Sequence, residues 1–170
     1  QMCIRDSSFT GWVIYPKDYD ENKKYPGVLS VHGGPKTVFG EVLFHEMELL
    51  SAKGYFVFYT NPRGSDGYEN EFMDIRGKYG DVDYSDLMKF TDIVMDKYPI
   101  DKLGYTGGSY GGFMANWMMT HTDRFDCFVS QRSISNWISF SLISDIGYYF
   151  GTDQNHTLTV LDDYDKLWDK

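Results

Sequence analysis

The sequence predicts an α/β fold in which a mostly parallel sheet is flanked by helices. Short apolar runs, typical of strands buried on both faces, alternate along the chain with segments of helical spacing. Glycine-rich turns follow two of these runs, at His32-Gly33-Gly34-Pro35 and at Gly107-Gly108-Ser109-Tyr110-Gly111-Gly112. Because strands that alternate with helices form βαβ units, most of the sheet is expected to be parallel.

Five strands are predicted. The first ends at Pro16, and the polar residues 17–24 that follow it form a turn. The third is a continuous apolar run, as expected of a strand with helices on both sides. The fourth runs directly into the glycine-rich turn at Ser109. The five ranges are 9–15, 28–31, 55–59, 103–106 and 125–130.

Three helices are predicted between these strands, over 44–53, 83–98 and 113–120. The first stops at Gly54, a residue type that favours helix ends. The second is the clearest, because apolar residues at offsets of three and four make one stripe along it. It has acidic residues in its first turn, where the helix dipole favours them, and Pro99 after its end.

Composition limits the class of protein. The chain has 170 residues, of which 42% are hydrophobic and 18% aromatic, so it suits one globular domain. Its formal net charge of −9 argues against nucleic acid or an anionic membrane as a partner. Two cysteines are too few for a disulfide framework or a metal site, and no cofactor is implied.

The beginning of the chain does not resemble a targeting segment or a natural start. Residues 1–7 lack the apolar stretch of a signal peptide, and the chain contains no apolar run of the roughly 18–20 residues that span a bilayer. We therefore expect a cytoplasmic protein. Residues 1–8 are expected to be a non-native or disordered leader, and residues 9–170 to form one partial catalytic domain.

The spacing Gly107-x-Ser109-x-Gly111 is typical of a nucleophile elbow, the sharp strand-to-helix turn of the α/β-hydrolase fold. Residues two positions on either side of the serine must be small, because larger side chains would collide in so tight a turn. The turn lifts the serine hydroxyl clear of the sheet and places the next N–H at a helix N-terminus, where it can stabilise an oxyanion. An ordinary glycine-rich βα turn is the alternative.

The upstream turn at His32-Gly33-Gly34-Pro35 fits the second half of such a site. In this fold the other oxyanion donor comes from the loop after an early strand, and glycine there lets the backbone approach a substrate closely. A plain turn is again the alternative. The predicted fold class is thus α/β, of the α/β-hydrolase kind, incomplete at its C-terminus.

Together these residues resemble the prolyl oligopeptidase family of serine peptidases, in particular its acylaminoacyl-peptidase-like branch. The resemblance covers about residues 9–170 and implies a peptidase that cleaves short peptides behind an N-terminal β-propeller, of which this chain has no sequence. Four blocks carry it: His32-Gly33-Gly34-Pro35, Asn61-Pro62-Arg63-Gly64-Ser65, Gly107-Gly108-Ser109-Tyr110-Gly111-Gly112-Phe113 and Ser130-Gln131-Arg132-Ser133-Ile134-Ser135-Asn136-Trp137.

The resemblance implies roles for individual residues. It assigns Ser109 as the nucleophile and the backbone N–H groups of Gly34 and Tyr110 to the oxyanion hole. It also points to Tyr110 and Trp137 as residues that line the substrate pocket, with a place in the core as the alternative for each. For Arg63, a structural salt bridge is favoured over contact with a substrate.

The remaining members of the catalytic triad are not expected within this chain. Triad order in this fold is serine, then acid, then histidine, and only His121 and His156 follow Ser109. His121 comes at the end of the helix that the elbow starts, so it should point away from the site. His156 follows Asp145 and Asp153, but the segment between lacks the two further strands that normally carry acid and base.

Three functions stay open at this point. A serine peptidase acting on peptides is the leading hypothesis, with no nucleic acid or membrane partner and no prediction of oligomeric state. A carboxylesterase or lipase of the same fold is the first alternative, although such enzymes usually have a third glycine where this chain has Pro35. A non-catalytic hydrolase-fold interaction module is the second.

Overall fold

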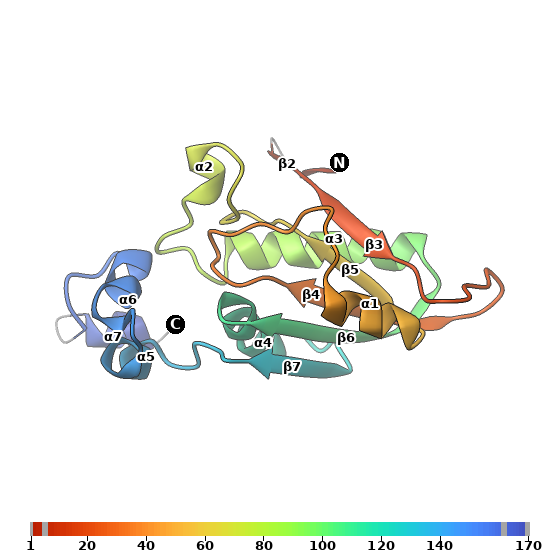
Figure 1. Ribbon diagram of the computed structural model, residues 1–170. Coiled ribbons are helices and arrows are strands. Elements are labelled where there is room, and N and C mark those ends of the chain that lie inside the picture. The colour runs from red at the N-terminus through yellow and green to blue at the C-terminus, as the bar shows by residue number, and fades with distance from the viewer. Residues whose placement is uncertain (1, 5–6, 161–162, 169–170) are drawn as a thin grey trace.

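The sheet has five strands in the order β3-β5-β4-β6-β7, as seen in the computed structural model, which describes residues 2–4, 7–160 and 163–168 (Figure 1). Four of the strands are parallel, and β3 pairs antiparallel with β5 at one edge. The prediction of five strands in a mostly parallel sheet is confirmed. The strands are β3 (Gly11–Ile14), β4 (Tyr25–Val31), β5 (Phe56–Thr60), β6 (Ile100–Gly108) and β7 (Cys127–Gln131).

Residues near the N-terminus form a separate two-stranded antiparallel sheet. It consists of β1 (Met2–Ile4) and β2 (Ser7–Phe9), and it lies beyond the start of β3 in Figure 1. That residues 1–8 are a non-native leader stays a prediction.

Three helices follow the strands as predicted, and four further helices were not predicted. The helix α3 begins one residue before the predicted start and ends one residue before the predicted end, while α4 begins directly after Ser109. None of the helices in the described ranges is both long and apolar enough to cross a membrane. The helices are α1 (His45–Ala52), α2 (Asn70–Met73), α3 (Val82–Lys97), α4 (Tyr110–His121), α5 (Trp137–Ile143), α6 (Gly147–Asn155) and α7 (Tyr164–Trp168).

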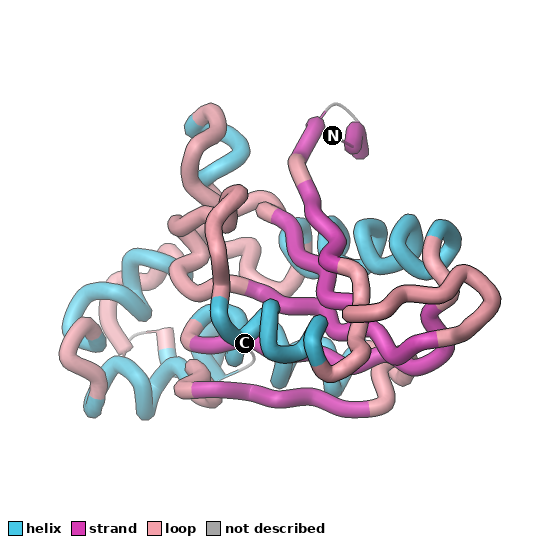
Figure 2. Tube along the Cα trace, turned by 45° about the vertical axis from the view of Figure 1, so that its right-hand side comes forward, coloured by secondary structure: helices cyan, strands magenta, loops and turns pink. Residues whose placement is uncertain are grey.

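The two faces of the sheet bury two separate apolar clusters. Successive side chains of β5 point alternately into one cluster and the other. Phe56 and Phe58 point into the larger cluster, together with Leu87 and Phe90 of α3. Val57 and Tyr59 point into the smaller one, together with Met47 of α1. Figure 2 shows α1 crossing in front of the sheet, with α3 on the far side. Burial on both faces explains why the sequence of β5 is apolar throughout.

The last three helices gather beyond the carboxyl ends of β6 and β7 (Figure 1). The helix α5 is capped by Asn136, whose side-chain oxygen accepts a hydrogen bond from the N–H of Ser139 at 2.8 Å. Trp137 of this helix is 1% exposed and anchors the group to the larger apolar cluster. The carboxyl ends of parallel strands are where ligands bind in α/β folds, so these helices stand beside the expected site.

Candidate active site

Ser109 lies on the turn between β6 and α4, as predicted. Its φ of 59° and ψ of −116° are unusual for a residue with a side chain, and the surrounding structure holds it there. The Ser109 N–H donates to the carbonyl of Gln131 at 2.9 Å, and the Ser109 carbonyl accepts from the N–H of Phe113 at 3.0 Å. The strained backbone leaves the Ser109 side chain exposed at the end of the sheet.

The glycines around Ser109 are required by close backbone contacts. A methyl group on Gly107 would come within 2.6 Å of the Gly111 carbonyl oxygen. A methyl group on Gly111 would run into the carbonyl oxygen of Val31 and lie 3.0 Å from that of His32. These contacts confirm the steric reason given for the Gly-x-Ser-x-Gly spacing.

The loop after β4 is held in place by His32. The buried ring donates from Nδ1 to the carbonyl of Gly33 at 2.7 Å and accepts at Nε2 from the Ser65 hydroxyl at 2.9 Å. Burial lowers the pKa of His32, which favours the neutral ring that this pattern needs. The Thr37 hydroxyl also donates to the Gly33 carbonyl, at 2.6 Å. His32 therefore fixes the loop and is not available as a base.

The loop passes close to the nucleophile at Gly33, a residue to which sequence reasoning gave no role. A methyl group on Gly33 would lie 3.3 Å from Cβ and 3.8 Å from Oγ of Ser109. Gly34 follows with φ of 118°, a conformation that favours glycine. The N–H groups of Gly34 and Tyr110 donate to no acceptor in the described part of the chain, so both donors are free for a ligand.

The Asn61 to Ser65 segment supports this loop from below. The Asn61 side chain bonds both the N–H and the carbonyl of Phe39, at 2.8 and 2.9 Å. Arg63 makes a two-pronged ion pair with Asp86 at 2.7 and 2.8 Å, which raises the pKa of the guanidinium further. The structural salt bridge favoured for Arg63 is confirmed. Because Ser65 also makes a hydrogen bond to His32, the residues of this segment support the loop after β4.

The Tyr110 side chain points into the core and not into the site. It has no exposed surface, and its hydroxyl donates to Oδ2 of Asp83 at 2.6 Å. Trp137 is likewise buried and packs edge-on against Tyr79. The structure therefore does not bring either aromatic side chain to Ser109, because both fill the core beneath the site. Only the backbone N–H of Tyr110 is placed beside the nucleophile.

Asp83 gives the protein a pH-dependent stability. Burial raises the pKa of Asp83 to about 6, although the hydrogen bonds from the Tyr110 hydroxyl and from the N–H of Tyr84 lower it. The folded protein thus holds the proton of the Asp83 carboxyl more tightly than the unfolded chain does. The stability that Asp83 contributes is therefore present below about pH 4 and is lost as the pH rises through 6. The free energy of unfolding relative to that of Asp83→Asn is expected to fall by about 2 kcal/mol between pH 4 and pH 7. Denaturant titrations of both proteins at the two pH values test this, and a constant difference would refute it.

None of the four histidines makes a hydrogen bond to Ser109, although His32 lines the same cavity. His32 bonds Ser65, and His45 is exposed at the start of α1. His121 stacks on Trp117 at the far end of α4, with the ring centroids 4.1 Å apart. His156 follows the last residue of α6 as its C-cap, and a methyl group on Gly77 would lie 3.2 Å from Cδ2 of its ring. Within the described ranges, no side chain makes a hydrogen bond to the Ser109 hydroxyl.

Ser109 opens into a cavity of about 340 Å³, called here the Ser109 cavity. Its wall is built from the ends of β4, β6 and β7 and from the start of α1. Among the described residues, no group of three or more His, Cys, Asp or Glu is arranged to hold a metal ion. Its lining includes Gly33, Gly108, Gln131 and Arg132, together with Phe39, Glu46 and Thr106.

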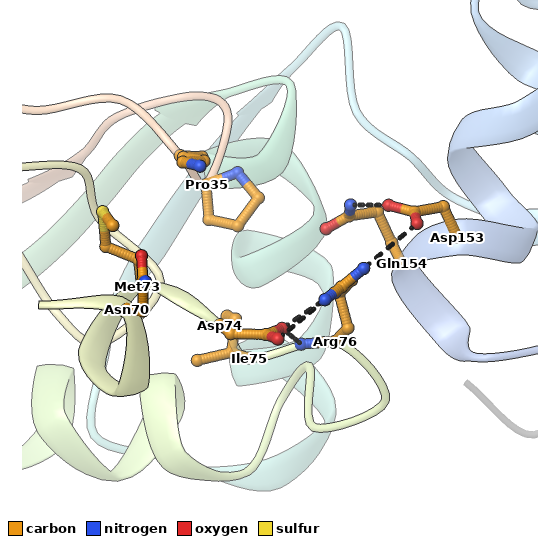
Figure 3. A pocket seen from close by; sticks show the side chains of 9 residues that line it. Pro35, Asn70, Met73, Asp74, Ile75, Arg76, Asp153 and Gln154 are labelled. Carbon is orange, nitrogen blue, oxygen red and sulfur yellow. Dashed lines mark hydrogen bonds and ion pairs between the residues drawn. The ribbon is translucent and has the colours of Figure 1, made fainter.

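A larger cavity, of about 470 Å³, does not include Ser109. Figure 3 shows it between Pro35, the segment around Arg76 and the end of α6. Of its two cationic residues, Lys36 and Arg76, the second is already paired, because Arg76 contacts Asp74 at 2.8 Å and Asp153 at 3.3 Å. The arrangement ties the segment after α2 to α6, whereas Ser109 lines the smaller cavity.

Comparison with known proteins finds a matching family and related peptidases. The model of the prolyl oligopeptidase family matches residues 41–169. The uncharacterized peptidase YuxL of Bacillus subtilis (strain 168) is 50% identical over 164 residues, which cover 94% of this chain and 25% of that protein. Dipeptidyl-peptidase 5 of Porphyromonas gingivalis is 35% identical over 132 residues, covering 74% of this chain and 19% of that protein.

A solved structure shows the same fold. The uncomplexed acylaminoacyl peptidase of Pyrococcus horikoshii superposes with a TM-score of 0.87 at 34% sequence identity, covering 95% of this chain and 26% of that one. The α/β-hydrolase fold predicted from the sequence is therefore confirmed. The chain spans about a quarter or less of the length of these relatives. With three quarters of its residues matched by the family model, the chain belongs to the prolyl oligopeptidase family.

Proposed function

We propose that the natural protein is a serine peptidase that hydrolyses short peptides through an acyl-enzyme on Ser109. The observation that carries the proposal is the position of Ser109, which is strained, exposed and flanked by two unused backbone donors. A nucleophile held so that its hydroxyl faces a cavity is the arrangement that acyl transfer needs.

The oxyanion of the tetrahedral intermediate would be bound by the N–H groups of Gly34 and Tyr110. Gly33 contacts Ser109, which supports a position for the next N–H beside the reacting carbon. The N–H of Tyr110 is at the first position of α4, where the helix dipole adds to its donor strength. The hydrogen bond from the Tyr110 hydroxyl to Asp83 anchors this residue from below.

The acid and base of the triad are proposed to come from chain outside these 170 residues. None of the four histidines makes a hydrogen bond to Ser109, and a base must be within about 2.6–3.2 Å of the hydroxyl whose proton it takes. The chain corresponds to only 25% of the length of YuxL, which leaves ample sequence for both residues. On this proposal, residues 1–170 alone are inactive.

The full natural chain is expected to hydrolyse short peptide anilides. Measuring kcat/KM on these substrates tests the peptidase proposal against the alternative of an esterase of the same fold. Peptidases also cleave activated esters, so aryl esters serve as the comparison and not as the main substrate. Turnover of aryl esters with no detectable cleavage of peptide anilides would favour the esterase. No turnover of either class would favour a non-catalytic interaction module.

A further inference from the structure

A cationic side chain lies in the wall of the Ser109 cavity on the side away from the Gly33 loop. In the sheet, β6 lies between β4 and β7, so Ser109 is flanked by Gly33 after β4 and by Arg132 after β7. The guanidinium group lies against the backbone just before the nucleophile. A methyl group on Gly108 would come within 2.6 Å of Nη2 of Arg132.

The backbone of Arg132 is held rigidly beside the elbow. Gln131 pairs with Gly108 in the sheet, and its carbonyl accepts the hydrogen bond from the Ser109 N–H. Ser133, on the other side, packs so tightly on the elbow that a methyl group on Gly112 would lie 2.7 Å from its Cβ. Arg132 itself has a φ of 42°, which is costly for a residue with a side chain. Such strain, beside a nucleophile, is typical of functional positions.

The guanidinium group of Arg132 has no ion-pair partner in the described ranges, in contrast to those of other arginines. Arg63, Arg76 and Arg124 each contact a carboxylate, whereas Arg132 has neither an ion pair nor a hydrogen bond with any residue in the described ranges. The carboxylate in the same cavity, Glu46, accepts long hydrogen bonds from Thr106 and Gln131 instead. An exposed guanidinium without a partner is ready to bind an anion, and its planar donors match a carboxylate.

We propose that Arg132 is a specificity-determining residue that binds a carboxylate of the peptide substrate beside Ser109. The inference rests on the proposed peptidase function and adds a substrate class, short peptides with a carboxylate on the amine part, which leaves as the acyl-enzyme forms. The carboxylate is either the C-terminus of a short leaving peptide or an acidic side chain in it. The Gly34 donor comes from the loop on the Gly33 side of Ser109, which leaves the Arg132 side for the leaving part.

The test uses the full natural chain and matched peptides cleaved at the same bond. One pair has a free C-terminal acid or an amide after a single leaving residue, and a second pair, amidated, has Glu or Gln as that residue. We expect a carboxylate form to be preferred, and Arg132→Gln to lower its kcat/KM by about 10- to 100-fold, through KM, while the neutral partner changes by less than about threefold. The pair that responds identifies the source of the carboxylate.

Two further variants separate binding from structure. Arg132→Lys keeps the charge but not the planar donors, so it should retain part of the preference. Arg124→Gln removes an exposed arginine that pairs with Asp92 at 2.7 Å before β7, at the opposite end of the sheet, and should leave the preference intact. An equal loss on acid and neutral peptides in Arg132→Gln, or no preference in the unmodified protein, would overturn the assignment.

Failure of the proposed function would look different. If Ser109→Ala still hydrolysed the peptides, the proposed mechanism through Ser109 would be refuted, regardless of the effect of Arg132 substitutions. If hydrolysis depends on Ser109 but not on a substrate carboxylate, only the role of Arg132 is refuted.

Discussion

Replacement of Ser109 by alanine is expected to lower peptide turnover by the full natural chain on the order of 10⁶-fold, as removal of the nucleophile does in serine proteases. That factor corresponds to about 8 kcal/mol of lost transition-state stabilisation. The variant should stay folded, because the Ser109 side chain is exposed and makes no hydrogen bond within the described ranges. The measurement is kcat on a short peptide anilide, with far-ultraviolet circular dichroism to verify the fold.

Ser139→Ala is the matched control for this change. Ser139 is also exposed, and it lies in the first turn of α5, where its side chain makes no hydrogen bond with a described residue. Its replacement should leave kcat within about twofold of the original value, since surface substitutions away from special features change little. Undiminished turnover by Ser109→Ala would remove the nucleophile from the account.

Gly111→Ala is expected to destabilise the fold by about 3 kcal/mol or more, although alanine is normally the better helix former. Gly111 is in the first turn of α4, and an added methyl group would meet the backbone carbonyl oxygens of Val31 and His32. A backbone cannot move aside as a flexible side chain can, so the helix must shift away from β4. That shift would also displace Ser109 and lower activity.

Gly40→Ala is the control for the glycine prediction. A methyl group at Gly40 would have no neighbour within 4 Å, and the residue has no positive φ. Its effect should lie within about 1 kcal/mol and on the stabilising side, through the unfolded state. The free energies of unfolding of both variants, from denaturant titration, make the comparison. Equal stabilities for Gly111→Ala and Gly40→Ala would show that α4 does not pack against β4 as described.

The parts of the fold that sequence could predict are those where one local pattern decides the outcome. The apolar run of β5 and the stripe of α3 identify their elements without knowledge of the rest. The antiparallel direction of β3 was not predicted, because a strand's own residues do not indicate which way its neighbour runs. The helices α5 and α6 were missed because each is short and gains its stability from packing around Trp137.

The site divides in the same way. Ser109 and its glycines were found because a strained turn imposes a spacing that can be recognised in sequence. Tyr110 and Trp137 could not be placed, since an aromatic residue suits a pocket and a core equally well. Gly33 and Arg132 carried no signal of their own, because their closeness to Ser109 depends on the pairing of β4 and β7 with β6.

Covalent labelling tests the central claim, that Ser109 is an activated nucleophile, most directly. The full natural chain is treated with a fluorophosphonate, which reacts with activated serines, and the adduct is mapped by peptide mass spectrometry. We expect one phosphonylated site, at Ser109, which is still labelled in Arg132→Gln and is not labelled in Ser109→Ala. An adduct on a different residue, or peptide hydrolysis without any adduct at Ser109, would contradict it.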